Sequence, residues 1–442
     1  MKDTRRGAET LELASESLLA INKCGLQGKF KIWCLQFMLI PKLLWPLLVY
    51  DICSSTVEAI EAKINKYTRK WLGVPPGLSN VAMYCRKAKL KLPMKYILEE
   101  YKCGKARLRT MLEESDDPVV KTAQPSLKTG RKWKVTEAVD EAKECLKIKE
   151  VIGQTQTDRR GLGSTTVKWW SKTEGKEKRD MIIDEIRNKE DSKRVQKAVQ
   201  QPQQGQWTNW DTAIQRSLTW NDIWHMAPLR ISFLIRSVYD LLPSNANLVR
   251  WKKKDDPTCP LCQAKEEIHP SSTSSTVFIT EGGVKKWHGG SVPINTQRKG
   301  LLDGCDDWVV SADLPEWERH PDVIRKTALR PDIVIHSAST QQIIMVELTI
   351  PYESRMEEAH AFKEEKYLEL TKELKKDGYE AKVMPVEIGA RRFVGSSAYG
   401  LLSKLSIGGN KRTKALRLLA ETAENSSRWI WSRRNERLLH KD

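Results

Sequence analysis

The sequence has 442 residues, more than one ordinary domain holds, and predicts two to four domains of about 100 to 200 residues each. Lys and Arg total 75 against 57 Asp and Glu, a net charge of +18 that favours a polyanionic partner and disfavours an enzyme of small acidic substrates. The 40% share of hydrophobic residues supports packed cores, whereas the 30% share of charged residues indicates long solvated helices or partly disordered linkers.

The nine cysteines and the first residues of the chain both argue against secretion. An odd number of widely spread cysteines does not suit a secreted disulfide framework. The N-terminal sequence MKDTRRGAETLELASES lacks the apolar core of a signal peptide. We therefore expect a reducing compartment, nuclear or cytoplasmic.

Residues 1–115 are expected to form a helical module. Apolar residues recur at helical spacing before the breaker Pro75-Pro76-Gly77, and they are Val57, Ile60, Ile64, Tyr67 and Trp71. The stretch 32–52 is almost continuously apolar and about long enough to cross a bilayer. Because Pro41 and Pro46 interrupt it and Lys42 lies near its centre, we expect a buried helical hairpin and no membrane contact, with a membrane helix as the alternative.

The composition of the remaining chain predicts five further regions. Residues 116–205 are basic and poor in large apolar residues, which indicates a helical or partly disordered linker. Residues 206–270 form a Trp-rich module in which one helix face carries Ile231, Leu234, Val238 and Leu241. A Ser/Thr/Gly linker follows at 271–304, an α/β domain at 305–400 and a helical tail at 401–442. Overall, the fold class expected is multidomain α plus α/β.

The most specific chemical pattern lies in the α/β domain, where apolar runs indicate the order β-β-α-β. Asp332 follows Arg330-Pro331 at the start of one run, and Glu347 lies inside the apolar run IIMVELTI. A turn between two antiparallel strands brings the two carboxylates together. Paired carboxylates can hold Mg²⁺, which polarises a phosphodiester and lowers the pKa of water bound to it. A buried carboxylate also requires a counter-charge or hydrogen-bond donors.

Two lysines are candidates for a third catalytic group. Between residues 354 and 376, one helix face carries Met356, Ala359, Lys363, Lys366, Leu370 and Leu374. A lysine on this inner face can sit beside the carboxylates and a phosphate, and Lys363 is the more central of the two. The alternative is that both lysines extend to solvent from the edge of the stripe and that one of them simply pairs with Glu347.

The series RPD, VELT, KEEKY and PVEIGA resembles the PD-(D/E)xK restriction-like endonuclease domain of non-LTR retrotransposon polyproteins, from residue 306 to about 434. The resemblance implies a Mg²⁺-dependent DNA endonuclease with Asp332 and Glu347 as metal ligands. That variant takes its lysine from the following helix, and here Thr349 stands two residues after the second acid. Relatives typically continue Gly-Ala-Arg-Gly, whereas this chain has Arg392 at the last position.

A partial zinc site precedes this domain. Cys259 and Cys262 have the spacing that lets two thiolates bind one Zn²⁺, and His269 is a candidate third ligand. The surrounding segment resembles the zinc-binding region of the same retroelements, in which a Cys is expected five residues after the His. This chain has Ser274 there, so the expected zinc knuckle is incomplete.

The N-terminal segment GKFKIWCLQFMLIPKLLWPLLVYDI resembles the thumb and linker that follow the polymerase palm in these elements. The sequence has no aspartate pair in an apolar hairpin to hold the two Mg²⁺ ions of a polymerase, so reverse transcription is not expected from this chain. These resemblances imply a truncated retrotransposon fragment with an endonuclease domain, and we expect it to bind DNA or RNA. The alternative is a catalytically inactive nucleic-acid-binding relic.

Overall fold

The computed structural model describes residues 4–123, 126–152, 170–260, 300–303, 305–313, 324 and 329–435. The chain divides into two compact units. Unit 1 comprises Met1–Gly205 and Ser217–Tyr239, and unit 2 comprises Gln206–Arg216 and Asp240–Asp442. The protein is mostly helical, with a C-terminal mixed sheet of four strands packed against helices, which confirms the expected α plus α/β class.

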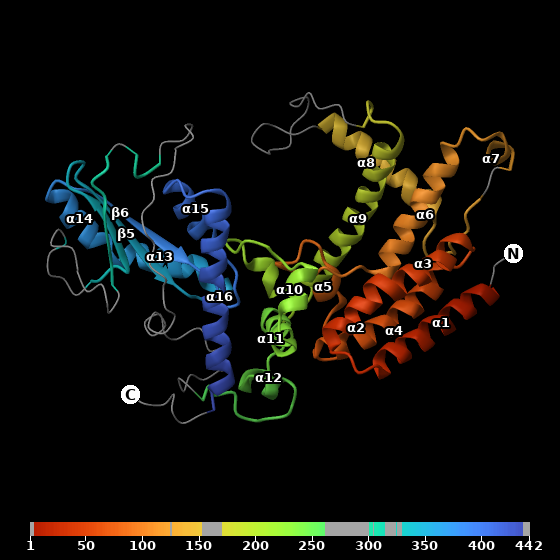
Figure 1. Ribbon diagram of the computed structural model, residues 1–442, viewed down its shortest axis with the longest axis horizontal. Helices are drawn as coiled ribbons and strands as arrows, with labels where there is room; N and C mark the ends of the chain where they lie inside the picture. The colour runs from red at the N-terminus through yellow and green to blue at the C-terminus, as the bar shows by residue number, and fades with distance from the viewer. Residues whose placement is uncertain are drawn as a thin grey trace. The chain divides into compact units, whose positions relative to one another are not determined.

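Unit 1 is a helical assembly (Figure 1). Its elements in chain order are α1 (Thr4–Lys23), α2 (Gly28–Cys34), the π-helical turn η1 (Leu35–Leu39), α3 (Ile40–Val49), α4 (Ser54–Leu72), α5 (Asn80–Tyr84), β1 (Leu90–Lys91), α6 (Ile97–Glu113), α7 (Pro118–Ala123), α8 (Val135–Ile152), α9 (Gly175–Val199), α10 (Trp220–His225) and α11 (Pro228–Val238). The short strand β2 (Arg216–Ser217) lies where the chain passes from one unit to the other.

The apolar stretch near the N-terminus forms one helix from Gly28 to Val49, so the expected hairpin is wrong. Pro41 lies in the first turn of α3, directly after the π-helical turn η1, where the regular α-helical hydrogen-bond pattern is already interrupted. Burial of one helix face offsets the cost of the backbone hydrogen bond that Pro46 removes. The buried side chains on this face are Ile32, Leu35, Leu39, Ile40, Leu43 and Leu47. The other face exposes Trp33, Phe37, Met38 and Trp45. Among the described residues this is the one helix long and apolar enough to cross a membrane.

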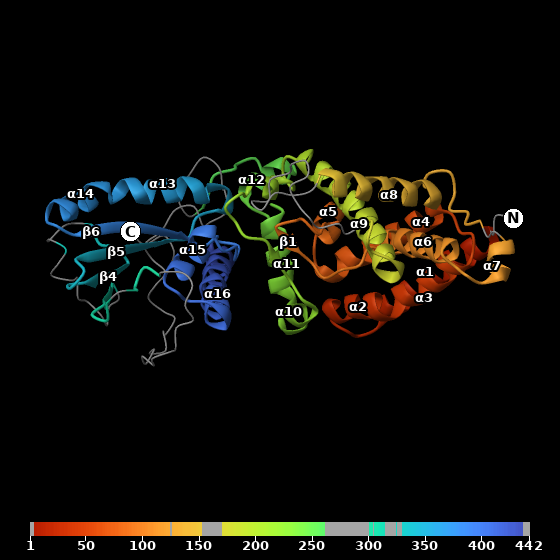
Figure 2. The ribbon, with the colours of Figure 1, turned by 90° about the horizontal axis from the view of Figure 1, so that it is seen from above.

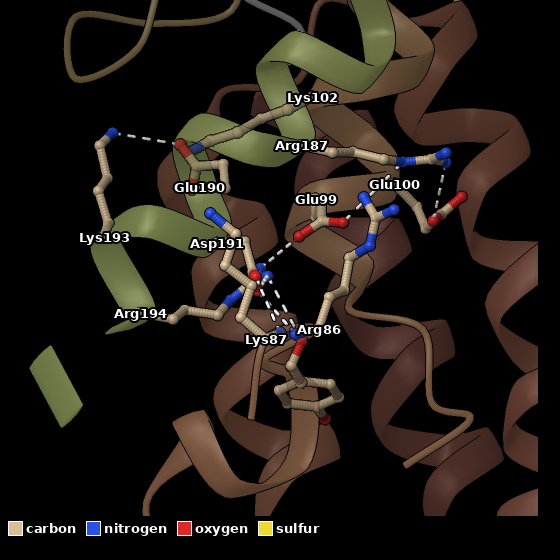
Figure 3. A network of polar contacts seen from close by, with 11 residues as sticks. Arg86, Lys87, Glu99, Glu100, Lys102, Arg187, Glu190, Asp191, Lys193 and Arg194 are labelled. Atoms are coloured by element: carbon tan, nitrogen blue, oxygen red, sulfur yellow. Dashed lines mark hydrogen bonds and ion pairs between the residues drawn. The ribbon is translucent and has the colours of Figure 1, made fainter. Parts of the chain in front are cut away.

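The region expected to be a basic linker contributes two long helices to unit 1. Helices α8 and α9 share a buried apolar cluster with α6, to which Val139, Leu146, Ile182 and Ile186 belong. Polar contacts also join α9 to the rest of the unit, as Figure 3 shows. Buried Asp191 accepts the backbone N–H groups of Arg86 and Lys87 at 2.7 and 3.1 Å, and Lys102 Nζ lies 3.0 Å from Glu190 Oε1. Part of the positive charge expected to meet nucleic acid is therefore used inside the unit.

Unit 2 contains the sheet, ordered β3-β4-β5-β6. Its elements are the 3₁₀ turn η2 (Gln206–Asn209), α12 (Asn245–Arg250), β3 (Val309–Ala312), β4 (Ile333–Ser337), β5 (Gln342–Thr349), the 3₁₀ turn η4 (Glu353–Arg355), α13 (Met356–Lys366), α14 (Leu368–Lys376), β6 (Glu380–Glu387), α15 (Ser396–Lys404) and α16 (Gly409–Arg433). Strands β3, β4 and β5 are antiparallel neighbours, and β6 runs parallel to β5. The expected order β-β-α-β is therefore present, with β3 added at the edge.

Helices cover both faces of this sheet, as Figure 2 shows. On one face, Tyr367, Leu370 and Leu374 pack against Ile343 and Met345. On the other face, α15 and α16 contribute Ala398, Ala420 and Ala423 to a second cluster, which contains Ile344 and Val346. Because side chains alternate along a strand, Glu347 points to the same face as Ile343 and Met345, toward α13 and α14.

Candidate active site

Glu347 lies near the end of β5 with 3% of its surface exposed. A carboxylate this deeply buried requires compensation. Lys363 Nζ lies 2.6 Å from Glu347 Oε1, and the Tyr367 hydroxyl donates a hydrogen bond to Oε2 at 2.9 Å. Both oxygens of Glu347 are thus satisfied by groups that the helices on this face supply.

Asp332 stands immediately before β4, beside Glu347. The antiparallel register pairs Ile333 with Val346, so the next position along the ladder brings Asp332 opposite Glu347. Asp332 Oδ2 accepts the backbone N–H of Leu348 at 2.6 Å. Burial and then the charge of Glu347 raise the pKa of Asp332, the Leu348 N–H and the two lysines oppose the rise, and the net pKa is about 6. The two carboxylates predicted from the sequence therefore lie together and interact electrostatically.

Both candidate lysines point to the same carboxylate. The Lys363 side chain is 12% exposed, and Lys366, whose side chain is 32% exposed, places Nζ 3.4 Å from Glu347 Oε1. Lys363 is therefore the closer and more buried partner, as its central place on the stripe predicts. The alternative in which both lysines extend to solvent does not describe Lys363, although a simple ion pair with Glu347 agrees with the same contacts.

Tyr367 also belongs to the cluster, although the sequence did not predict it. It is fully buried, and its hydroxyl lies 2.9 Å from both Glu347 Oε2 and the backbone oxygen of Arg330. Burial and the charge of Glu347 raise the pKa of Tyr367, so the phenol keeps its proton and acts as a donor. In the sequence an aromatic residue beside apolar helix positions looks like ordinary core, and the helical spacing of four from Lys363 was the available signal.

The donor set suits a hard divalent cation. Mg²⁺ prefers carboxylate oxygens and keeps several waters, so it needs only one or two protein carboxylates. Asp332 Oδ1 accepts no hydrogen bond from the described part of the chain. The described residues contain no group of three or more His, Cys, Asp or Glu side chains arranged to hold a metal. A Mg²⁺ ion would therefore depend on Asp332 and Glu347.

The loop after β6 is built around two arginines. Arg391 is 1% exposed, its Nε lies 2.8 Å from Glu353 Oε2, and its guanidinium stacks 3.6 Å from the Tyr352 ring centroid. Arg392, where the resembling family has glycine, adopts φ +76°, the left-handed region. This conformation costs about 1–2 kcal/mol for a residue with a Cβ. Ion pairs of Arg392 with Glu421 and Glu424 on α16 hold the loop in this shape.

The predicted zinc ligands fall mostly outside the described residues. Cys259 is buried, whereas Cys262, His269 and Ser274 are not among the residues that the structure describes. Cys305, the next cysteine along the chain, lies with Sγ 3.2 Å from Ser337 Oγ at the end of β4. The incomplete zinc knuckle therefore stays a prediction.

Comparison with models of known protein families found no match for this chain. Comparison with curated proteins found no significantly similar sequence.

Proposed function

We propose that unit 2 is a Mg²⁺-dependent DNA endonuclease of the PD-(D/E)xK type, and that the chain is part of a non-LTR retrotransposon polyprotein acting in the nucleus. The observation that carries this proposal is the convergence of Asp332, Glu347 and Lys363 on one face of the sheet. Asp332 has a raised pKa and Glu347 is buried. Buried paired carboxylates with a lysine beside them are typical of functional sites, because a structural ion pair needs only one of each.

The chain's own residues would prepare the site as follows. Asp332 and Glu347 would hold the cation, which supplies Lewis-acid chemistry to the phosphate when bound. The Leu348 N–H and the Tyr367 hydroxyl fix the orientation of the two carboxylates. With a cation held by Glu347, the Lys363 ammonium would be free to stabilise the negative charge that develops on the phosphoryl oxygens.

Nicking of supercoiled plasmid DNA in Mg²⁺ or Mn²⁺ tests this proposal. Asp332→Ala and Glu347→Ala should each abolish nicking while leaving DNA binding almost unchanged, because the groups removed are negative. Glu365→Gln, an exposed position on the same helix, is the matched control and should nick as the wild type does. Equal nicking by wild type and both alanine variants, or none by any protein, contradicts the assignment.

The second candidate function is a nucleic-acid-binding relic without catalysis. It is favoured by one observation, the 2.6 Å contact between Lys363 Nζ and Glu347 Oε1, which neutralises the carboxylate with no need for a metal. In this case the net charge of +18 still gives sequence-tolerant binding through phosphate contacts. Binding without nicking identifies this candidate. Reverse transcription is not part of either proposal.

A further inference from the structure

A pocket of about 310 Å³ opens on the face of the sheet that α13 covers. Its lining includes His360, Glu387 and Ser397. The register of β5 and β6 pairs Thr349 with Glu387, so Glu387 lies one strand away from Glu347 and two positions further along. Because positions 347, 349 and 387 share a face, the pocket lies on the same face of the sheet as the proposed cleavage site.

The three pocket residues form an ordered hydrogen-bonded chain. Glu387 is 4% exposed, and the Ser397 hydroxyl donates to its Oε2. Its other oxygen, Oε1, lies 2.9 Å from His360 Nδ1. A buried carboxylate held from behind thus fixes the tautomer and the orientation of a histidine ring, and leaves Nε2 as the outward nitrogen.

The outward nitrogen faces a second, movable carboxylate. His360 Nε2 lies 3.4 Å from Glu364 Oε1, on the same helix, and the Glu364 side chain is 59% exposed. Glu357, also on α13, lines the pocket. Carboxylates thus face both ring nitrogens of His360, and the exposed Glu364 can move aside for a substrate.

His360 also stands close to the catalytic cluster. It precedes Lys363 by three residues, which is about one helical turn. Lys363 and Tyr367 both donate to Glu347, and the proposed function gives Lys363 the phosphoryl oxygens, so neither is assigned to the oxygen that leaves phosphorus. His360, with its outward ring nitrogen on the same helix, is a candidate for that proton donor.

We propose that His360, in its protonated form, donates its Nε2 proton to the leaving oxygen of the cleaved phosphodiester, with Glu387 and Ser397 as positioning residues. The inference rests on the proposed endonuclease function. A water oxygen forms the new bond to phosphorus and releases its proton to solvent. The bond from phosphorus to the leaving oxygen breaks, its electron pair stays on that oxygen, and the His360 proton neutralises it.

Two oligonucleotide substrates test the proposal, one with the natural scissile oxygen and one with a bridging sulfur as leaving atom. A thiolate leaves without a proton, so His360→Gln should slow cleavage of the oxygen substrate by about 10²–10⁴-fold and leave cleavage of the sulfur substrate close to wild type. Glu365→Gln, an exposed position on the same helix with no contact to His360, should cleave both substrates nearly as well as wild type. Equal loss on both substrates with His360→Gln overturns the acid role while the endonuclease function stands. No cleavage of either substrate by wild type overturns the endonuclease function, and the inference with it.

A measurement without DNA checks the underlying geometry and separates it from folding. Nitrogen-15 spectra of the histidine rings should show His360 Nδ1 bearing a hydrogen-bonded proton in the wild type. Glu387→Gln should weaken that bond, whereas the circular dichroism of the variant should match the wild type. A wild-type His360 whose Nδ1 is unprotonated would overturn the proposal.

Discussion

The groups around Asp332 act on its pKa in opposite directions. Burial and the nearby charge of Glu347 favour its neutral form, whereas the Leu348 N–H and the lysines favour its charged form. The net result is a pKa of about 6, compared with 3.8 for an ordinary aspartate. A positive charge next to the Asp332 carboxylate stabilises its charged form and lowers its pKa. A bound cation would supply such a charge.

This balance predicts how the stability of unit 2 depends on pH. Because the folded pKa lies above the unfolded one, the folded state binds the proton more tightly, so stability is lost as pH rises from about 4 to about 6. The loss has an upper limit of about 3 kcal/mol and is smaller because the side chain retains solvent contact. Asp332→Asn should therefore raise the apparent melting temperature at pH 8 and leave it unchanged at pH 3.5. A difference that does not depend on pH would contradict the assignment.

The sequence predicted the catalytic candidates Asp332, Glu347 and Lys363 because each belongs to a sequence pattern. Asp332 and Glu347 are acids at the start of one apolar run and inside another, and Lys363 interrupts an apolar helix stripe. The sequence did not predict Tyr367 and His360, because their contacts depend on which strands the helix packs against. Only the packing of α13 over β5 and β6 shows that Tyr367 meets Glu347 and His360 meets Glu387.

At the scale of elements, the buried ion pair between Lys363 and Glu347 joins α13 to β5. Removing one partner of such a pair leaves an uncompensated buried charge and costs up to about 3–5 kcal/mol, whereas replacing both is often neutral. Lys363→Met should therefore destabilise unit 2 more than the double variant Lys363→Met with Glu347→Gln. In Lys363→Met, Lys366 Nζ still lies 3.4 Å from Glu347 Oε1 and partly compensates its charge, which limits the loss of stability. Thermal denaturation of the two single variants and the double variant measures the coupling, and additive effects would show that the pair does not act as a unit.

Among the elements, apolar runs predicted β4, β5 and β6, and the apolar stripe predicted a single helix over 354–376, which the structure divides at Tyr367 into α13 and α14. Strand β3 was not predicted, since Val309 and Val310 are exposed and pair only at the edge. The expected hairpin in residues 32–52 failed for a local reason. The π-helical turn η1 precedes Pro41 and lets the helix continue, and the buried face of α3 offsets Pro46.

At the scale of the whole molecule, composition did not reveal the division into units. The chain enters unit 2 at Gln206, returns to unit 1 at Ser217 and leaves it again after Tyr239, so the expected Trp-rich module at 206–270 is divided between them. Trp210 packs against Phe393 in unit 2, whereas Trp224 packs against Phe30 in unit 1. Tryptophans close in sequence thus pack in different units, which a composition shift cannot distinguish.

The net charge of +18 predicts salt-dependent binding to nucleic acid by the whole chain. Phosphate contacts release counterions, so affinity for both DNA and RNA should fall about tenfold or more between low and physiological salt, with little dependence on sequence. The internal ion pairs of α9 lower the number of cations available, which makes the slope shallower than the net charge alone implies. Fluorescence anisotropy over a salt titration measures this, and a flat titration would contradict a phosphate-binding surface.

The central claim is that Asp332 and Glu347 hold one divalent cation, and calorimetric titration with Mg²⁺ and Mn²⁺ tests it most directly. We predict one site per chain that binds more tightly at pH 8 than at pH 5, since Asp332 must lose its proton. Asp332→Asn and Glu347→Gln should each remove the site, and Glu365→Gln should retain it. Binding that survives both substitutions, or no binding by the wild type at pH 8, would show that the carboxylates and Lys363 form a structural ion pair and not a metal site.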